Sequence, residues 1–93
     1  MYNLVDIAPT IADILRISMP KRDGAAIPEV IKELDQCGKM ILIIVDGFGL
    51  SIYERYKHYF NFRSMVFKCQ GVSMNTIPSI ATILTGLRPI NHE

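Results

Sequence analysis

A run of six apolar residues, Met40–Val45, lies between Gly38 and Gly47 and is the longest unbroken apolar stretch of the chain. Most of its residues are β-branched, and the run is too short for a buried helix, so it predicts a strand that is buried on both faces. Strands of this kind occur in parallel sheets with helices on both sides. The run therefore favours a layered α/β fold over an all-helical or an all-β one.

Helix and strand signals alternate along the rest of the chain. Pro9 and Pro28 each suit the first turn of a helix, and Thr10 with Asp13 fits a capping box. The patterns predict helices over 9–15, 28–37, 50–60 and 78–85, and strands over 2–6, 40–45 and 65–74. This order predicts an α/β fold, a partial three-layer α/β/α sandwich with a short and mainly parallel sheet.

The 93 residues have room for one small domain. We expect a single domain over 1–93, with a helical segment over 1–38 followed by a β-α-β-α segment over 39–93. Hydrophobic residues make up 49% of the chain and charged residues 20%, a balance that excludes a disordered polypeptide. The formal net charge is +1, so charge predicts neither a nucleic-acid partner nor binding to an acidic membrane.

Cysteine content and hydropathy bear on the cellular compartment. The two cysteines, Cys37 and Cys69, are far apart and form no CxxC pair, so a disulfide scaffold is not expected. No apolar run approaches the roughly 20 residues that a membrane helix needs. The first residues lack a basic stretch followed by an apolar one, so no signal peptide is predicted. These features predict a cytoplasmic protein without a membrane partner.

The first candidate site follows the apolar run, at Asp46. Ligands bind at the carboxyl ends of the strands in open α/β sheets, where a carboxylate can hold a metal or orient a substrate. Gly47 lets the backbone come close to such a ligand, so we expect it to bind substrate. Asp46 as a cap of the next helix is an equally open alternative. A weaker alternative is a nucleotide-binding module, since Gly47-x-Gly49 fits part of the dinucleotide fingerprint although Ile52 takes its third glycine position.

The second candidate site is Asn75 with Thr76, between the strand expected over 65–74 and the helix expected over 78–85. Free backbone N–H groups at a helix N-terminus suit a phosphate or sulfate, so we expect Asn75 to bind substrate. The Thr76 hydroxyl, activated by a metal, can attack phosphorus and is the candidate catalytic residue. A simple N-cap at either residue is the competing interpretation.

Two stretches, ILIIVDGFG and NTIPSIATILTGLRPINHE, resemble the start of the alkaline phosphatase superfamily, and most closely its type I phosphodiesterase/nucleotide pyrophosphatase branch. In that branch a strand ends in a metal-binding Asp-Gly, and a Thr-Phe-Pro-like motif supplies the nucleophile. A Thr-Gly-Leu-x-Pro stretch and a His follow, as Gly86 and His92 do here. The resemblance implies that Asp46 and Thr76 bind a divalent metal, zinc or manganese, and that Thr76 is the nucleophile.

A further stretch, VDIAPTIADILRISMPKRDG, resembles the closing segment of the same superfamily. The C-terminal-like segment (1–27) thus precedes the N-terminal-like segment (39–93). This order implies a circularly permuted enzyme, one part of a split enzyme or a junction between tandem copies. The superfamily site takes three Asp and three His besides its nucleophile, and only Asp46 matches one of them. The isolated chain is therefore expected to be incomplete.

The resemblance implies a partial metal-dependent hydrolase or phosphotransferase that acts on a phosphodiester, a nucleotide pyrophosphate or another small phosphate or sulfate ester. The alternative is a non-catalytic, self-associating α/β module of the same ancestry. Part of a doubly wound sheet leaves edges and apolar faces open. A homo-oligomer or a complementing chain would cover them.

Overall fold

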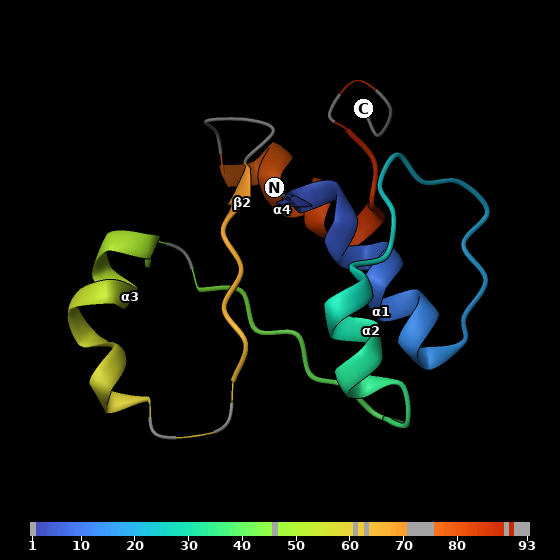
Figure 1. The fold of residues 1–93 in the computed structure, drawn as a ribbon. Helices are drawn as coiled ribbons and strands as arrows, with labels where there is room; N and C mark the ends of the chain where they lie inside the picture. Colours follow the sequence, from blue (N-terminus) through green and yellow to red (C-terminus); the bar gives the residue numbers. More distant parts are fainter. Residues whose placement is uncertain are drawn as a thin grey trace.

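The computed structural model describes residues 2–45, 47–60, 62, 64–70, 76–88 and 90, with residues 70 and 76–78 described by their backbone alone. Its elements, in chain order, are β1 (Tyr2–Asn3), the short 3-10 helix η1 (Leu4–Asp6), α1 (Ile7–Leu15), α2 (Pro28–Leu34), α3 (Leu50–Tyr56), a second 3-10 helix η2 (Lys57–Tyr59), β2 (Cys69–Gln70) and α4 (Thr76–Thr85). In Figure 1, α1, α2 and α4 gather on one side of the molecule, whereas α3 stands apart on the other.

The predicted three-layer α/β/α sandwich is wrong. Helices dominate the part of the chain that the structure describes, and strand pairing there is limited to β1 and β2. These strands have two residues each and pair in parallel, Tyr2 with Cys69 and Asn3 with Gln70. Of the stretch 65–74, expected to be a strand, only Cys69–Gln70 is one among the described residues. Two residue pairs do not make a sheet that helices could cover on both faces.

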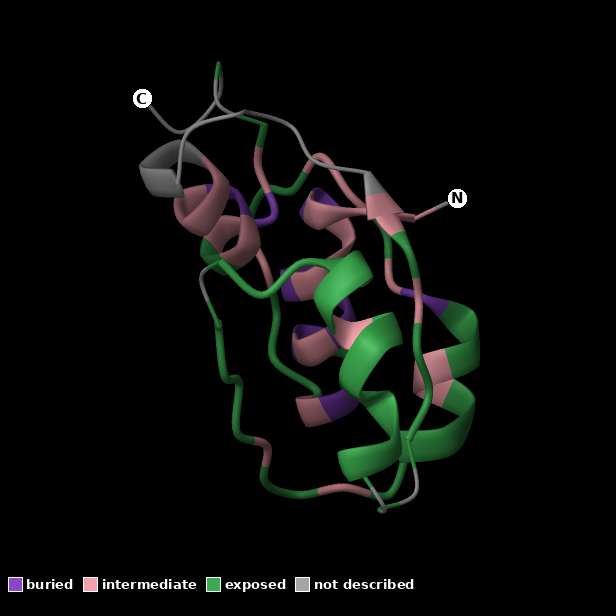
Figure 2. Ribbon diagram, turned by 90° about the vertical axis from the view of Figure 1, so that its left-hand side faces the viewer, coloured by how far each residue is buried: buried purple, intermediate pink, exposed green. Residues whose placement is uncertain are grey.

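The apolar run that predicted a central strand forms no regular element over residues 40–45. Met40 is half-buried, and the side chains of residues 41–45 are exposed, from 40% at Ile44 to 88% at Ile41. Figure 2 shows most of this stretch in the colour of exposed residues. A doubly buried strand needs hydrogen-bonded neighbours and helices over both faces, and the described part of this chain supplies neither.

The core lies where α1 meets its neighbours. Ala8 and Ala12, one turn apart on α1, are buried, as is Ile14 at 1% exposed. The helix packs against α2, α4 and η1, and η1 in turn packs against α4. Pro9 is tolerated in the first turn of α1 because no hydrogen bond from its nitrogen is required there. Arg16 adopts a left-handed conformation, φ 59°, and ends the helix.

The two remaining expected helices are shorter than their sequence patterns. The prediction over 28–37 is confirmed as α2, which begins at Pro28 but ends at Leu34. The prediction over 50–60 is divided into α3 and η2. No residue of α3 is buried. The aromatic ring of Tyr53 in α3 contacts that of Phe60, seven residues later in the chain, with ring centroids 5.7 Å apart. The helix α3 therefore stands outside the core built on α1.

None of the helices among the described residues combines the length and the apolar character that crossing a bilayer requires.

Candidate functional site

The turn after the apolar run contains the first candidate residues. Asp46 lies outside the described residues. Gly47 has φ +72°, a left-handed conformation that L side chains rarely adopt, and it is exposed. Gly49 is the N-cap of α3, and its carbonyl oxygen accepts a 3.0 Å hydrogen bond from the Tyr53 nitrogen. The turn thus requires a glycine at position 47, whereas substrate binding by Gly47 stays a prediction.

The second pair of candidates lies at the start of α4. The predicted helix over 78–85 is confirmed, and it begins two residues earlier, at Thr76. Thr76 is therefore a residue of the first helical turn rather than the residue ahead of it. The side chain of Thr76 and the whole of Asn75 and His92 lie outside the described part. The backbone N–H groups of a helix's first turn have no partners within the helix, as an anion site requires.

A groove of about 540 Å³ lies beside the turn that follows Asp46 in sequence. Phe48 and Gly49 from the turn and Tyr53 from α3 line one part of it, and residues 66–69, which lead into β2, line another. The turn that follows Asp46 in sequence therefore lies beside the segment that precedes Thr76. Lys68 in this lining is the positively charged group of the groove among the described residues.

Cys69 is a second potential nucleophile in the groove. Burial raises the pKa of the Cys69 thiol above its ordinary value, and the negative charge of Asp6 adds to the effect. The thiolate is the reactive form of cysteine, and a raised pKa makes it scarcer at neutral pH. The thiol is free, as is that of Cys37. The surroundings of Cys69 thus disfavour cysteine chemistry in this groove.

Metal binding was expected at Asp46 and Thr76. The described residues contain no group of three or more His, Cys, Asp or Glu side chains placed to hold one ion. Zinc in enzymes takes three protein ligands and an open position. The described side chains therefore do not fit a complete zinc or manganese centre, and a tightly held ion would need ligands from elsewhere.

The end of α4 is fixed against the start of α1. Gly86 has φ +69°, and a Cβ added there would lie 3.0 Å from Cδ of Pro9. The Gly86 carbonyl accepts a 2.7 Å hydrogen bond from the Asp23 nitrogen. The Asp23 carboxylate accepts one of 2.7 Å from the Arg88 nitrogen. Residues 86–88 are thus held by the loop that follows α1.

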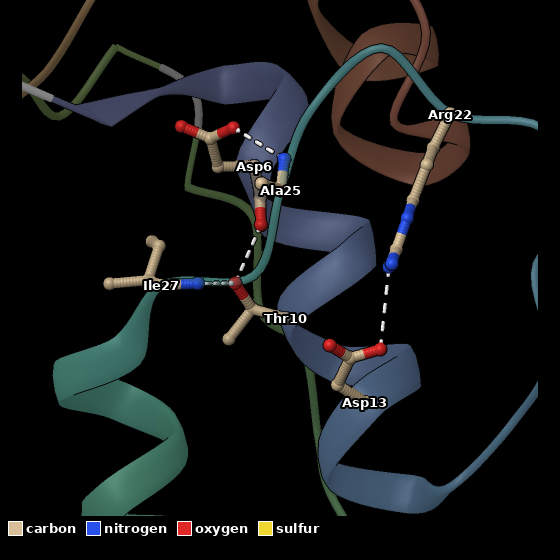
Figure 3. Close-up of polar contacts among 6 residues, drawn as sticks. All are labelled: Asp6, Thr10, Asp13, Arg22, Ala25 and Ile27. Atoms are coloured by element: carbon tan, nitrogen blue, oxygen red, sulfur yellow. Dashed lines mark hydrogen bonds and ion pairs between the residues drawn. The ribbon is translucent and has the colours of Figure 1, made fainter.

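Two polar residues that the sequence patterns did not single out as a site organise this loop (Figure 3). The Asp6 carboxylate accepts hydrogen bonds from the nitrogens of Asn3, at 2.9 Å, and Ala25, at 3.0 Å. With Asn3 it forms a capping box at the start of η1. The predicted capping box of Thr10 with Asp13 is wrong, because the Thr10 hydroxyl donates to the Asp6 carbonyl oxygen. The N-x-x-D spacing of Asn3 and Asp6 was a usable signal for the real capping box.

Comparison with protein families, with curated proteins and with solved structures finds no match for this chain. The resemblance to the alkaline phosphatase superfamily therefore stays a hypothesis that depends on the motifs.

Proposed function

We propose that the chain is a partial metal-dependent phosphoester hydrolase or phosphotransferase with Thr76 as its nucleophile. Asp46 and Thr76 would bind the zinc or manganese, with Gly47 and Asn75 beside the substrate. The observation that supports this is the contact between the two stretches that carry the resemblance. Gly86, in the opening-like segment, lies against Pro9, in the closing-like segment.

This contact is informative because the two stretches are far apart in sequence. The hydrogen bond from Arg88 to Asp23 joins residues 65 positions apart. Two parts of one ancestral fold are expected to pack together in this way. The parallel pairing of β1 with β2 joins the same two segments a second time.

The proposed reaction is transfer of a phosphoryl group to the Thr76 hydroxyl. The hydroxyl oxygen forms a bond to phosphorus while the bond from phosphorus to the leaving group breaks, and the proton passes to solvent. The first-turn N–H groups of α4 donate to the phosphoryl oxygens, where negative charge grows. Asp46 and Thr76 would hold a divalent metal, and such an ion would make the attacking hydroxyl easier to deprotonate. Water or a second alcohol then releases the group from Thr76.

The net charge of the chain supports a class of substrate, and its cysteines support a cellular location. The net charge of +1 supports a small phosphate or sulfate ester as substrate rather than a nucleic acid. The free thiols of Cys37 and Cys69 support a cytoplasmic location.

The test is incubation of the chain with bis-p-nitrophenyl phosphate and zinc or manganese. We expect release of p-nitrophenol that depends on metal but is slow, because the chain lacks most metal ligands of the superfamily, with p-nitrophenyl phosphate transiently attached at Thr76 and detected by peptide mass spectrometry. A single attachment is detectable even where turnover is slow. Thr76→Ala removes the hydroxyl and should abolish both signals, whereas Thr76→Ser retains a hydroxyl and should keep part of them. Equal release by the Ala variant, or no attachment in the unmodified chain, would refute the proposal.

A further inference from the structure

The chain exposes more accessible surface than a compact monomer of the same mass would expose. Its accessible surface is 7087 Å². A folded monomer of 10.5 kDa exposes about 5,400 Å² by the usual scaling with mass. The radius of gyration, 13.7 Å, also exceeds the roughly 12 Å of a compact chain of this length. About 1,600 Å² is therefore exposed beyond what a compact monomer of this mass would show.

Part of this surplus is apolar surface at the stretch Ile41–Val45, which we call the apolar strip. Ile41, Ile43 and Val45 are 88%, 75% and 60% exposed, whereas Leu42 and Ile44 between them are 44% and 40% exposed. Exposure alternates with a period of two, as it does in an extended chain with one face covered. The odd-numbered residues thus form one open apolar row.

The even-numbered side of the strip faces the body of the molecule. Leu42 lines two grooves, of about 260 and 320 Å³, and Ile11 of α1 lines both of them as well. Ile41 reaches the rim of the smaller groove but is 88% exposed. Among the described residues, no backbone hydrogen bond involves residues 41–45. The strip therefore lies over α1 with its outer row of side chains open, and the part of the chain that the structure describes places no strand beside it.

We propose that a second copy of this chain pairs edge to edge with the apolar strip, the two strips forming antiparallel strands. Unpaired backbone N–H and C=O groups beside β-branched side chains form a template for another strand. A stable interface buries about 800 Å² on each partner, which is half of the surplus surface. The net charge of +1 leaves little repulsion between two copies.

The charges that flank the strip favour the antiparallel direction. The sequence has Lys39 shortly before the strip and Asp46 directly after it. Antiparallel pairing brings the Lys39 end of each copy to the Asp46 end of the other, whereas parallel pairing would bring like charges together. Opposite charges at both ends stabilise the first arrangement and disfavour the second. This pairing does not depend on whether Thr76 reacts.

The test is the mass of the chain in solution, measured by sedimentation over a range of concentrations. We expect one species with twice the mass of the chain. Ile43→Lys places two like charges close together at the centre of the paired strips and should raise the dissociation constant about two- to fivefold. Ile90→Lys is the matched control, since Ile90 is 82% exposed and lies outside the strip, and it should leave the dissociation constant unchanged. Circular dichroism establishes that both variants keep their helix content.

Exchanging the charges of Lys39 and Asp46 tests whether the two strips pair in the antiparallel direction. Lys39→Glu should weaken the dimer about two- to tenfold, and adding Asp46→Lys should restore it. A monomeric unmodified chain, a dimer whose dissociation constant Ile43→Lys leaves unchanged, or large aggregates in place of a dimer would overturn the proposal. A dimer that Lys39→Glu does not weaken would overturn the antiparallel direction.

Discussion

The amide nitrogen of Ile27 donates a 2.9 Å hydrogen bond to the hydroxyl oxygen of Thr10, which lies 17 residues earlier in the chain. The same hydroxyl donates a 2.6 Å hydrogen bond to the carbonyl oxygen of Asp6. Thr10 is 5% exposed, and Ile27 is the N-cap of α2. One buried hydroxyl therefore connects η1, α1 and the start of α2.

Thr10→Val should lower the free energy of unfolding by about 1–3 kcal/mol, because it keeps the shape of the side chain and leaves the buried Ile27 N–H without a partner. Thr10→Ser keeps the hydroxyl and loses one methyl group, so it should cost about 1 kcal/mol or less. Urea denaturation of both variants measures the difference. A Val variant as stable as the Ser variant would show that the hydroxyl does not hold α2 in place.

Gly24→Ala should destabilise the chain by about 1–3 kcal/mol, because a Cβ there would collide with the backbone of Val5 and lie 2.7 Å from the Asp6 carboxylate. Gly38→Ala is the matched control. No atom lies within 4 Å of its added Cβ, so its effect should stay within about 0.5 kcal/mol. Thermal unfolding of the two variants compares them, and equal melting temperatures would contradict the close approach of the loop to η1.

The helices α1 and α4 could be predicted because their signals are local. Pro9 fits the first turn of α1, and Gly86 follows the end of α4 in the left-handed conformation that a C-terminal glycine adopts. The strand expected over 40–45 failed for the opposite reason. A run of β-branched residues records a preference for an extended backbone, but a sheet also requires neighbours, and local sequence does not say whether they exist.

The candidate site could be predicted only in part. The glycine at position 47 and the helix over 78–85 follow from turn and helix signals, whereas the start of that helix at Thr76 does not. The contacts that hold the surrounding chain do not, because Thr10 reaches Ile27 and Asp23 reaches Arg88 across long stretches of sequence. The partner of such a side chain depends on the tertiary fold, and it cannot be predicted from residue spacing along the chain.

Asp23→Ala should free the Arg88 amide, whose partner is the Asp23 carboxylate at 2.7 Å. We expect faster hydrogen exchange at Arg88, since an exposed amide without a partner exchanges readily. The Thr85 hydroxyl accepts a 3.2 Å hydrogen bond from the Leu87 nitrogen and does not involve Asp23, so Leu87 is the internal reference. Equal acceleration at both amides would indicate general loosening rather than loss of one contact.

The Cys69 thiol should ionise at a higher pH in the folded chain than in the unfolded one. Burial raises its pKa above the ordinary 9.0, and the nearby charge of Asp6 raises it further. Because the folded state holds this proton more tightly, its contribution to stability is complete below pH 9.0 and is lost as the pH rises through the folded pKa.

The rate of alkylation by iodoacetamide, followed against pH in a Cys37→Ser variant, reports the ionisation of Cys69 alone. We expect the midpoint of the native chain to lie above the midpoint of the same variant in urea. The free energy of unfolding should also decrease in alkaline solution, and Cys69→Ser should remove that part of the decrease. A native midpoint at or below the denatured one would mean that the groove beside β2 does not bury the thiol.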